Sequence, residues 1–278
     1  MCENDRAGDH HAGPVTVSFI IPNWNNRVLL DVCLKTVYAA SRNLSHEVIL
    51  VDNGSNDDSV SFVREHYPGV RLVANGVNLG YAKAINQGAE IAIADVLVLL
   101  NNDVELLPST VETLLGHLGR DPQVGAVAPL LYYPDGRLQI SCRRFPTPAA
   151  LLLEMLGVDS LGPFGRWKVP AEELLRGGDV EQPMTAVLAV RRLCWEEVGP
   201  MDEGFPIFFN DVDWFYRLHR KTDCRVTLCT DARAVHHEGA STRTLGLRKK
   251  TELLKGLIRF YLKHYVAKGG AALAGSTR

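Results

Sequence analysis

Short apolar runs alternate with amphipathic stretches through the first half of the chain. The runs at 15–21, 47–51, 70–74 and 96–100 predict four buried β-strands. Residues 26–40, 57–66, 81–94 and 108–118 place apolar side chains at helical spacing, and Pro68-Gly69 ends the second of these helices. Strands and helices that alternate in this way predict an α/β fold with a mostly parallel central sheet flanked by helices.

The second half of the chain is less regular. Its pattern predicts strands at 124–129, 184–190 and 225–228, helices at 192–198 and 211–221, and an irregular insertion over 143–169. A basic amphipathic helix is expected over 247–265. We therefore expect one domain over 14–242, preceded by a disordered tail over 1–13 and followed by this helix and a tail over 243–278.

Polar turns follow each of the four strands of the first half. In open parallel sheets, ligands bind at the carboxyl ends of the strands, so a site is expected at these turns. They are rich in amide side chains and consist of Pro22-Asn23-Trp24-Asn25, Asp52-Asn53-Gly54-Ser55, Asn75-Gly76 with Asn78-Leu79-Gly80, and Asn101-Asn102-Asp103. The edge is built like a nucleotide site, yet there is no GxGxxG after the first strand and no GKS or GKT. These absences argue against a dinucleotide dehydrogenase and a P-loop ATPase.

Composition narrows the class of protein further. The 278 residues include 30 basic and 32 acidic side chains, so no global charge draws the chain to nucleic acid. No apolar run reaches the roughly 18 residues of a membrane span. The polar N-terminus lacks a secretory signal, and none of the six cysteines forms a CxxC pair. We expect a cytoplasmic protein with reduced thiols and no zinc knuckle.

Two carboxylates at the strand ends are candidates for ligand chemistry. Asp52 can accept a hydrogen bond from a nucleobase or a ribose hydroxyl, or it forms an Asx-turn before Gly54. Asp103 is an oxygen ligand of the kind that Mg²⁺ or Mn²⁺ takes together with phosphates, or it caps the next helix. A metal held there would neutralise a departing diphosphate.

The segment FFNDVDWF, which contains Asp211 and Asp213, is the most informative for catalysis. On a helix the two carboxylates point about 200° apart, so one can face a cleft while the other caps the helix or pairs with a cation. Desolvation by the aromatic neighbours would raise a carboxyl pKa, which suits a general base; alternatively, both carboxylates only cap the helix. His236, in the stretch HHEGAS, either completes a metal site near Asp103 or is structural.

Taken together, six elements in order resemble glycosyltransferase family 2, whose members have a GT-A fold. They are VSFIIPNWN, VILVDNGSNDDS, NLGYAKAINQG, VLVLLNNDVEL, VGPMDEGFPIFFNDVDWFYRL and HHEGAS. With RRFPTP, the pattern looks closest to the rhamnosyltransferase-like branch. The resemblance implies a nucleotide-binding N-terminal half and an acceptor-binding C-terminal half. It also implies inverting transfer of a sugar, rhamnose in that branch, from a dTDP- or UDP-type donor to a hydroxyl of a glycan or lipid-linked acceptor.

The resemblance implies roles for individual residues as well. Asp211 would be the catalytic base, with Asp213 as a rival if the helix register differs. Asp103 and His236 would bind a divalent metal, Mg²⁺ or Mn²⁺, that stabilises the leaving diphosphate. The nucleotide sugar would contact Pro22, Asn25, Asp52, Asn53, Asn78, Gly80, Lys83, Asn102 and Thr185.

Three positions depart from the family pattern. The metal element, Asn101-Asn102-Asp103, offers one carboxylate rather than two, so it is expected to bind metal weakly and to depend on the diphosphate. The acidic pair is Asn210-Asp211, in which an amide replaces the first acid. Thr185 stands where the family often has Gly, which would narrow the sugar pocket.

Two other functions are compatible with the sequence. A nucleotidyltransferase that forms a nucleotide sugar could share the fold class, but PNWNNR lacks the glycines and basic residues of a triphosphate loop. A non-catalytic nucleotide- or carbohydrate-binding protein would need Asp103 and Asp211 only as caps. The basic C-terminal helix either contacts the inner face of the cell membrane peripherally, near a lipid-linked acceptor, or packs on the domain with a solvated basic side.

Overall fold

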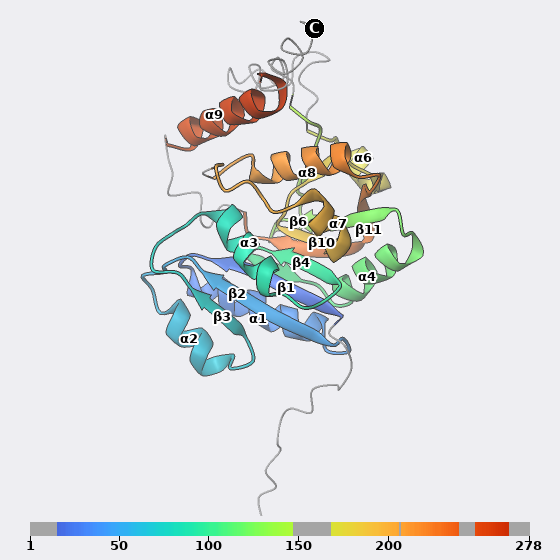
Figure 1. Cartoon of the computed structure of the whole chain (residues 1–278). Helices are drawn as coiled ribbons and strands as arrows, with labels where there is room; N and C mark the ends of the chain where they lie inside the picture. Colours follow the sequence, from blue (N-terminus) through green and yellow to red (C-terminus); the bar gives the residue numbers. More distant parts are fainter. Residues whose placement is uncertain (1–15, 147–167, 206, 239–247, 267–278) are drawn as a thin grey trace, which may run out of the picture.

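One mixed sheet forms the centre of the structure, a computed structural model that describes residues 16–146, 168–205, 207–238 and 248–266 (Figure 1). Its strands are β1 Val17–Asn23, β2 His46–Asp52, β3 Arg71–Ala74, β4 Val96–Leu100, β5 Val104–Leu106, β6 Val124–Tyr132, β8 Gly178–Asp179, β10 Val187–Arg191 and β11 Arg225–His236. In the described part of the chain they are ordered β3-β2-β1-β4-β10-β6-β11-β5, with β8 paired to β11. A small second sheet pairs β7 (Cys142–Arg143) with β9 (Gln182–Pro183).

The four strands of the first half lie parallel, as the alternating pattern predicts. β1 pairs in parallel with both β2 and β4, and β3 extends the sheet beside β2. β10 then runs antiparallel between β4 and β6, while β11 is parallel to β6. The carboxyl ends of β1, β2 and β4 therefore meet at one edge, which confirms the predicted α/β architecture.

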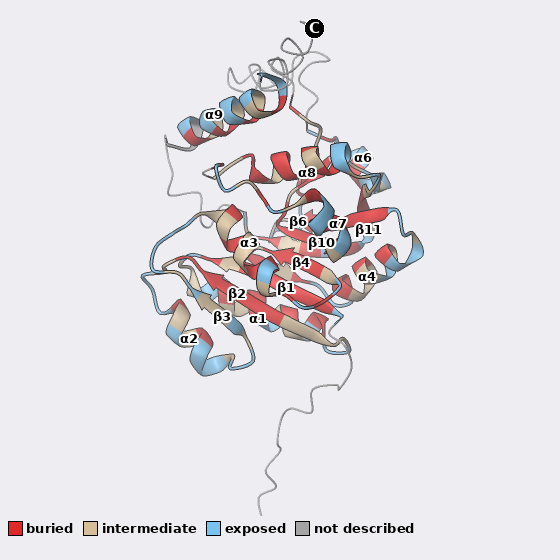
Figure 2. Cartoon of the chain, viewed as in Figure 1, coloured by how far each residue is buried: buried red, intermediate tan, exposed pale blue. Residues whose placement is uncertain are grey.

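Helices cover both faces of the sheet because successive strand side chains point to opposite sides. Phe19 packs in a core with α1 (Arg27–Ala40), α2 (Ser59–His66) and α4 (Thr110–Arg120). Its neighbour Ile20 packs in the opposite core, and the helices there are α3 (Tyr81–Ile91), α6 (Ala171–Arg176), α7 (Arg192–Val198) and α8 (Asn210–Lys221). Figure 2 shows the central strands as almost continuously buried.

The C-terminal helix α9 (Arg248–Tyr261) continues into the π-helical turn η3 (Leu262–Val266) and lies beyond α8 from the sheet (Figure 1). Phe260 enters a small aromatic core with Phe209 and Tyr216. Gly256 permits this close packing, since a Cβ at that position would lie 2.8 Å from the carbonyl oxygen of Phe208. One side of the predicted amphipathic helix therefore packs on the domain.

Several element boundaries differ from the sequence prediction. α4 begins at Thr110, so Pro108 precedes it instead of occupying its first turn. α3 ends at Ile91, and β6 and β11 are longer than predicted. The elements β5, β7, β8, β9 and α6 were not predicted. The predicted tails, most of the insertion and Ser241, the last residue of the element HHEGAS, lie outside the described residues. Among the residues that are described, no helix combines the length and apolarity needed to cross a membrane.

Candidate active site

A buried chain of side-chain hydrogen bonds joins the ends of β4, β1 and β2. Asn102 Nδ2 donates to Asn23 Oδ1 at 2.7 Å, and Asn23 Nδ2 donates to Asp52 Oδ2 at 2.8 Å. Ser55 donates to both Asp52 oxygens, through its backbone N–H at 2.9 Å and its hydroxyl at 2.5 Å. Asp52, which is only 1% exposed, thus accepts hydrogen bonds within its own turn, the kind of interaction that the sequence offered as the alternative to nucleoside binding. Its role in nucleoside binding stays a prediction.

The neighbouring loop folds back onto the turn that follows β2. Asn53 Nδ2 donates to the carbonyl of Gly80 at 3.1 Å, and the side chain of Asn78 accepts from the Gly80 N–H at 2.9 Å. Gly54 has φ +72°, and a Cβ there would lie 2.8 Å from Cα of Val77, so the close approach of the two loops requires glycine.

Most of the residues predicted to hold the nucleotide sugar thus belong to one edge of the sheet. Asn25 joins them through its backbone N–H, which donates to the Ser55 hydroxyl at 2.7 Å, and Pro22 lies on β1 opposite Val51. Lys83 is not part of this network: it forms an ion pair with Glu203 at 3.3 Å, in which both side chains are well exposed. Its predicted contact with the donor stays a prediction.

Asp103 and His236 come together where β4 ends and β11 ends. Oδ1 of Asp103 lies 3.4 Å from Nε2 of His236, and both side chains are buried. The other ring nitrogen, Nδ1, is 2.9 Å from Oε1 of Gln139. Asp103 and His236 are therefore close together, as predicted. Asp103 does not cap α4, because the residue at the N-terminal boundary of that helix is Ser109.

This pair fits a divalent cation. Oδ1 of Asp103 is buried and has no hydrogen-bond partner among the described residues, so a carboxylate oxygen and an imidazole nitrogen face one another. Within the same residues, no group of three or more His, Cys, Asp or Glu side chains could hold a metal. The protein would thus supply one carboxylate and one imidazole and leave the other positions to water and phosphate oxygens.

Asp211 and Asp213 on α8 have different surroundings. Burial raises the pKa of Asp211, although the N–H of Val212 and the charge of Arg143 both act to lower it. Oδ1 of Asp211 accepts from that N–H at 2.8 Å. Asp213 is 0% exposed and lies within 2.8 Å of Arg217 and 2.7 Å of both Lys263 and His264. Because Asp213 is enclosed by cations, Asp211 is the candidate base.

Comparison with known proteins identifies the family. The family model described as glycosyl transferase family 2 matches residues 18–162. The chain belongs to glycosyltransferase family 2.

Relatives of this glycosyltransferase include proteins of cell-surface polysaccharide synthesis. It is 33% identical over 228 residues to N-acetylglucosaminyl-diphospho-decaprenol L-rhamnosyltransferase of Mycobacterium tuberculosis, covering 74% of this chain and 72% of that protein. It is 29% identical to O-antigen biosynthesis protein RfbC of Myxococcus xanthus, covering 83% of this chain but 18% of that protein. These similarities confirm the predicted rhamnosyltransferase-like character.

Solved structures confirm the GT-A fold. GalNAc-T7, solved with UDP, GalNAc and Mn²⁺, superposes with a TM-score of 0.61 at 16% identity, covering 80% of this chain and 43% of that one. Mannosyltransferase PcManGT from Pyrobaculum calidifontis, solved with GDP-Man and Mn²⁺, gives 0.59 at 19% identity, covering 91% and 67%. The match to the family model and the 33% identical rhamnosyltransferase confirm the glycosyltransferase interpretation over the nucleotidyltransferase and the non-catalytic binding protein.

Tyr81 of the glycosyltransferase is a site residue that the sequence analysis missed. Burial raises the pKa of Tyr81, and the charges of Asp211 and Asp103 raise it further. Its hydroxyl donates to Oγ1 of Thr185 at 3.0 Å. Tyr81 therefore contacts Thr185, the predicted sugar-pocket residue, and lies within the electrostatic influence of Asp211 and Asp103. The available signal was its place directly after Gly80, at the first residue of α3 in the element NLGYAKAINQG.

Arg143 is a second residue that was missed. It lies on β7, and its charge acts on the pKa of Asp211 and on that of Glu238 beside His236. The segment RRFPTP contains it, but that segment was used only to suggest a branch of the family. The guanidinium of Arg143 consequently adds a positive charge near the carboxylates of Asp211 and Glu238.

Proposed function

We propose that this glycosyltransferase inverts the anomeric centre in a single displacement, with Asp211 as the general base. Asp211 would take the proton of an acceptor hydroxyl, whose oxygen attacks the anomeric carbon from the face opposite the diphosphate. The bond from that carbon to the diphosphate oxygen breaks, and the diphosphate leaves with the electron pair. The observation that supports this role is the contrast within α8: Asp211 is half-buried with a raised pKa, whereas Asp213 is fully buried and contacts Arg217, Lys263 and His264. General-base action contributes about 10²–10⁴-fold.

We propose that Asp103 and His236 bind a divalent metal, Mg²⁺ or Mn²⁺. The support is the buried, unpartnered Oδ1 of Asp103 opposite Nε2 of His236. Once bound, such an ion supplies positive charge that neutralises the diphosphate. Since only one carboxylate is offered, the affinity for metal should depend on the phosphate oxygens of the donor.

The donor is proposed to be a dTDP- or UDP-type nucleotide sugar, with rhamnose as the sugar. The amide-rich edge after β1, β2 and β4 would hold its nucleoside through Asp52 and its neighbours, at the position where open sheets bind ligands. Rhamnose is suggested by the name of the Mycobacterium tuberculosis relative, which also suggests a lipid-linked acceptor. A soluble glycan acceptor is the alternative.

The outer side of α9 is proposed to meet an anionic membrane surface, where a lipid-linked acceptor would lie. Leu254, Ile258 and Leu262 form an exposed aliphatic row, and Ile258 is 50% exposed. The adjacent cations are engaged by carboxylates: Arg259 and Lys263 pair with Asp202, and Lys255 pairs with Glu252. The exposed aliphatic row therefore carries the proposed contact, because an exposed apolar face on an amphipathic helix is typical of helices that lie in the membrane interface.

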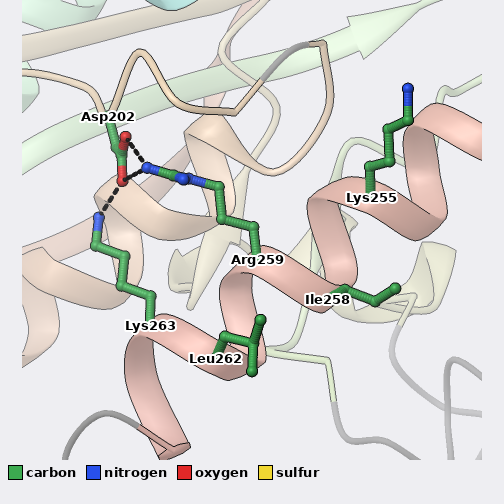
Figure 3. Close-up of a pocket in the computed structure, with 6 residues that line it drawn as sticks. All are labelled: Asp202, Lys255, Ile258, Arg259, Leu262 and Lys263. Atoms are coloured by element: carbon green, nitrogen blue, oxygen red, sulfur yellow. Dashed lines mark hydrogen bonds and ion pairs between the residues drawn. The ribbon is translucent and has the colours of Figure 1, made fainter.

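Figure 3 shows a hollow lined by side chains of α9 and η3 and by Asp202. Ile258 and Leu262 line it together with the cations, and Arg259 and Lys263 reach Asp202 at 2.9 and 2.7 Å. None of the predicted donor or metal residues lines this hollow. The hollow is thus separate from the proposed active site.

The reaction is tested with purified full chain, a short polyprenyl-diphospho-sugar acceptor and Mn²⁺. A thermal-shift panel of dTDP-, UDP- and GDP-sugars first selects the donor, because a ligand that binds the native state raises its melting temperature. The anomeric configuration of the product is then determined by NMR. Inversion supports the proposal, whereas retention contradicts a single displacement.

Membrane contact is tested separately by flotation with vesicles containing an anionic phospholipid. The double variant Ile258→Ser/Leu262→Ser should float less than the wild type, while the matched surface variant Leu193→Ser should float equally. Equal flotation of the α9 variant and the wild type would contradict this contact.

A further inference from the structure

The imidazole of His236 is the end of a hydrogen-bond chain that starts at Glu238. Tyr133 Oη and Gln139 Nε2 both donate to Oε2 of Glu238 at 2.8 Å. Oε1 of Gln139 lies 2.9 Å from Nδ1 of His236. Gln139 is only 1% exposed, so its amide cannot replace these hydrogen bonds with hydrogen bonds to water.

Hydrogen-bond chemistry allows one arrangement of this chain. A carboxylate oxygen accepts, so the NH₂ group of Gln139 must face Glu238 and its carbonyl must face His236. An amide oxygen also only accepts, so Nδ1 of His236 must carry the hydrogen. In the neutral imidazole, the form that binds a metal, the lone pair of Nε2 is then directed toward Oδ1 of Asp103, 3.4 Å away.

The fold delivers Gln139 to this position through a tight turn. After β6 the chain reverses, with the Tyr133 N–H donating to the carbonyl of Arg137 at 2.8 Å. The Gln139 N–H then donates to the carbonyl of Leu131 at 2.8 Å, which fixes the returning segment against β6. β11 is parallel to β6 and ends at His236, so Gln139 meets that imidazole from the neighbouring segment.

We propose that Gln139 is a positioning residue that, oriented by Glu238, fixes His236 as its Nδ1–H tautomer and thereby sets the affinity of the site for a divalent cation. This inference rests on the metal role proposed above for Asp103 and His236. Outer partners of metal-bound histidines typically account for about 10–100-fold in metal affinity. Gln139 and Glu238 act through His236 and need not touch the substrate.

The test measures Mn²⁺ binding to the full chain, as the loss of the free-ion signal in electron paramagnetic resonance, with Mn²⁺ alone and with UDP or dTDP added. Gln139→Met keeps the approximate volume but removes the acceptor, and should weaken Mn²⁺ binding by about 10-fold or more. The double variant Gln139→Glu/Glu238→Gln offers His236 an acceptor again and should bind Mn²⁺ within about threefold of the wild type. His237→Gln, at the adjacent histidine that contacts Glu105, is the matched control and should bind as the wild type does.

Three outcomes decide the matter, with thermal melts confirming that each variant is folded. Weak binding by Gln139→Met together with recovery in the double variant supports the tautomer role. If Gln139→Met binds Mn²⁺ like the wild type, or if the double variant is as weak as Gln139→Met, the positioning role is overturned. If Asp103→Ala also binds Mn²⁺ like the wild type, the metal proposal itself fails, and this inference fails with it.

Discussion

Nε2 of His264 lies 2.7 Å from Oδ1 of Asp213, and this contact ties the C-terminal turn η3 to the helix that holds Asp211. Lys263 reaches the same oxygen at 2.7 Å, and Arg217 reaches the other at 2.8 Å. The C-terminal helix therefore supports the proposed catalytic helix through a buried ionic cluster.

The first prediction concerns this cluster. Asp213→Asn removes the charge that faces Arg217 and Lys263, and breaking a buried ion pair from one side costs about 3–5 kcal/mol. Urea denaturation should show the loss as a lower midpoint. Asp202→Asn, which removes a more exposed partner of Lys263 and Arg259, should cost less. Equal stability of Asp213→Asn and the wild type would show that the cluster contributes nothing.

The second prediction is a pH dependence. Burial raises the pKa of Asp211 above the ordinary 3.8, so turnover should fall on acidification with a midpoint above that value. A raised folded-state pKa also means that this group's stabilising contribution is complete below its unfolded pKa and is lost as pH rises through the folded one. Asp211→Asn should therefore be at least as stable as the wild type at pH 7.5. A pH–rate profile and thermal melts check both statements; an acid midpoint at or below 3.8 would refute the first.

The third prediction separates metal-dependent donor binding from binding without metal. Wild-type donor affinity, measured by calorimetry, should increase when Mn²⁺ is added. Asp103→Ala should show the same, weaker affinity with and without Mn²⁺, because one of two proposed ligands is gone. Glu105→Gln changes a nearby carboxylate that contacts His237 instead, and should keep the Mn²⁺ effect.

The fourth prediction concerns the turn after β2. Gly54→Ala places a Cβ 2.8 Å from Cα of Val77 at φ +72°, and the left-handed conformation alone costs about 1–2 kcal/mol. The variant should melt at a lower temperature and bind the donor more weakly, as the turn and the 75–80 loop separate. Gly76→Ala, where nothing lies within 4 Å, is the control and should retain donor affinity.

The sequence alone predicts those site residues that lie directly after an apolar strand or within one helix. The apolar runs of β1, β2 and β4 and the polar residues directly after them predict both the parallel strands and the edge where Asp52 and Asp103 lie. The helix containing Asp211 and Asp213 was also predictable from spacing, as was their divergence.

What the sequence could not supply depends on contacts between distant segments. The proposed choice of Asp211 over Asp213 rests on Lys263 and His264, about fifty residues further along the chain. Gln139 reaches His236 only because the chain reverses after β6 and returns beside β11. No local sequence pattern predicts that contact. Pro108 was misplaced because proline is compatible both with the first turn of a helix and with the turn before it.

The most direct test of the central claim is the transfer rate of Asp211→Asn at saturating donor and Mn²⁺, measured beside donor affinity. Loss of the general base predicts a fall of about 10²–10⁴-fold in kcat with donor Kd unchanged. Asp231→Asn, the same change at an exposed position of β11, should leave both quantities unaltered. Turnover of Asp211→Asn within a few fold of the wild type would contradict the assignment of Asp211 as the base.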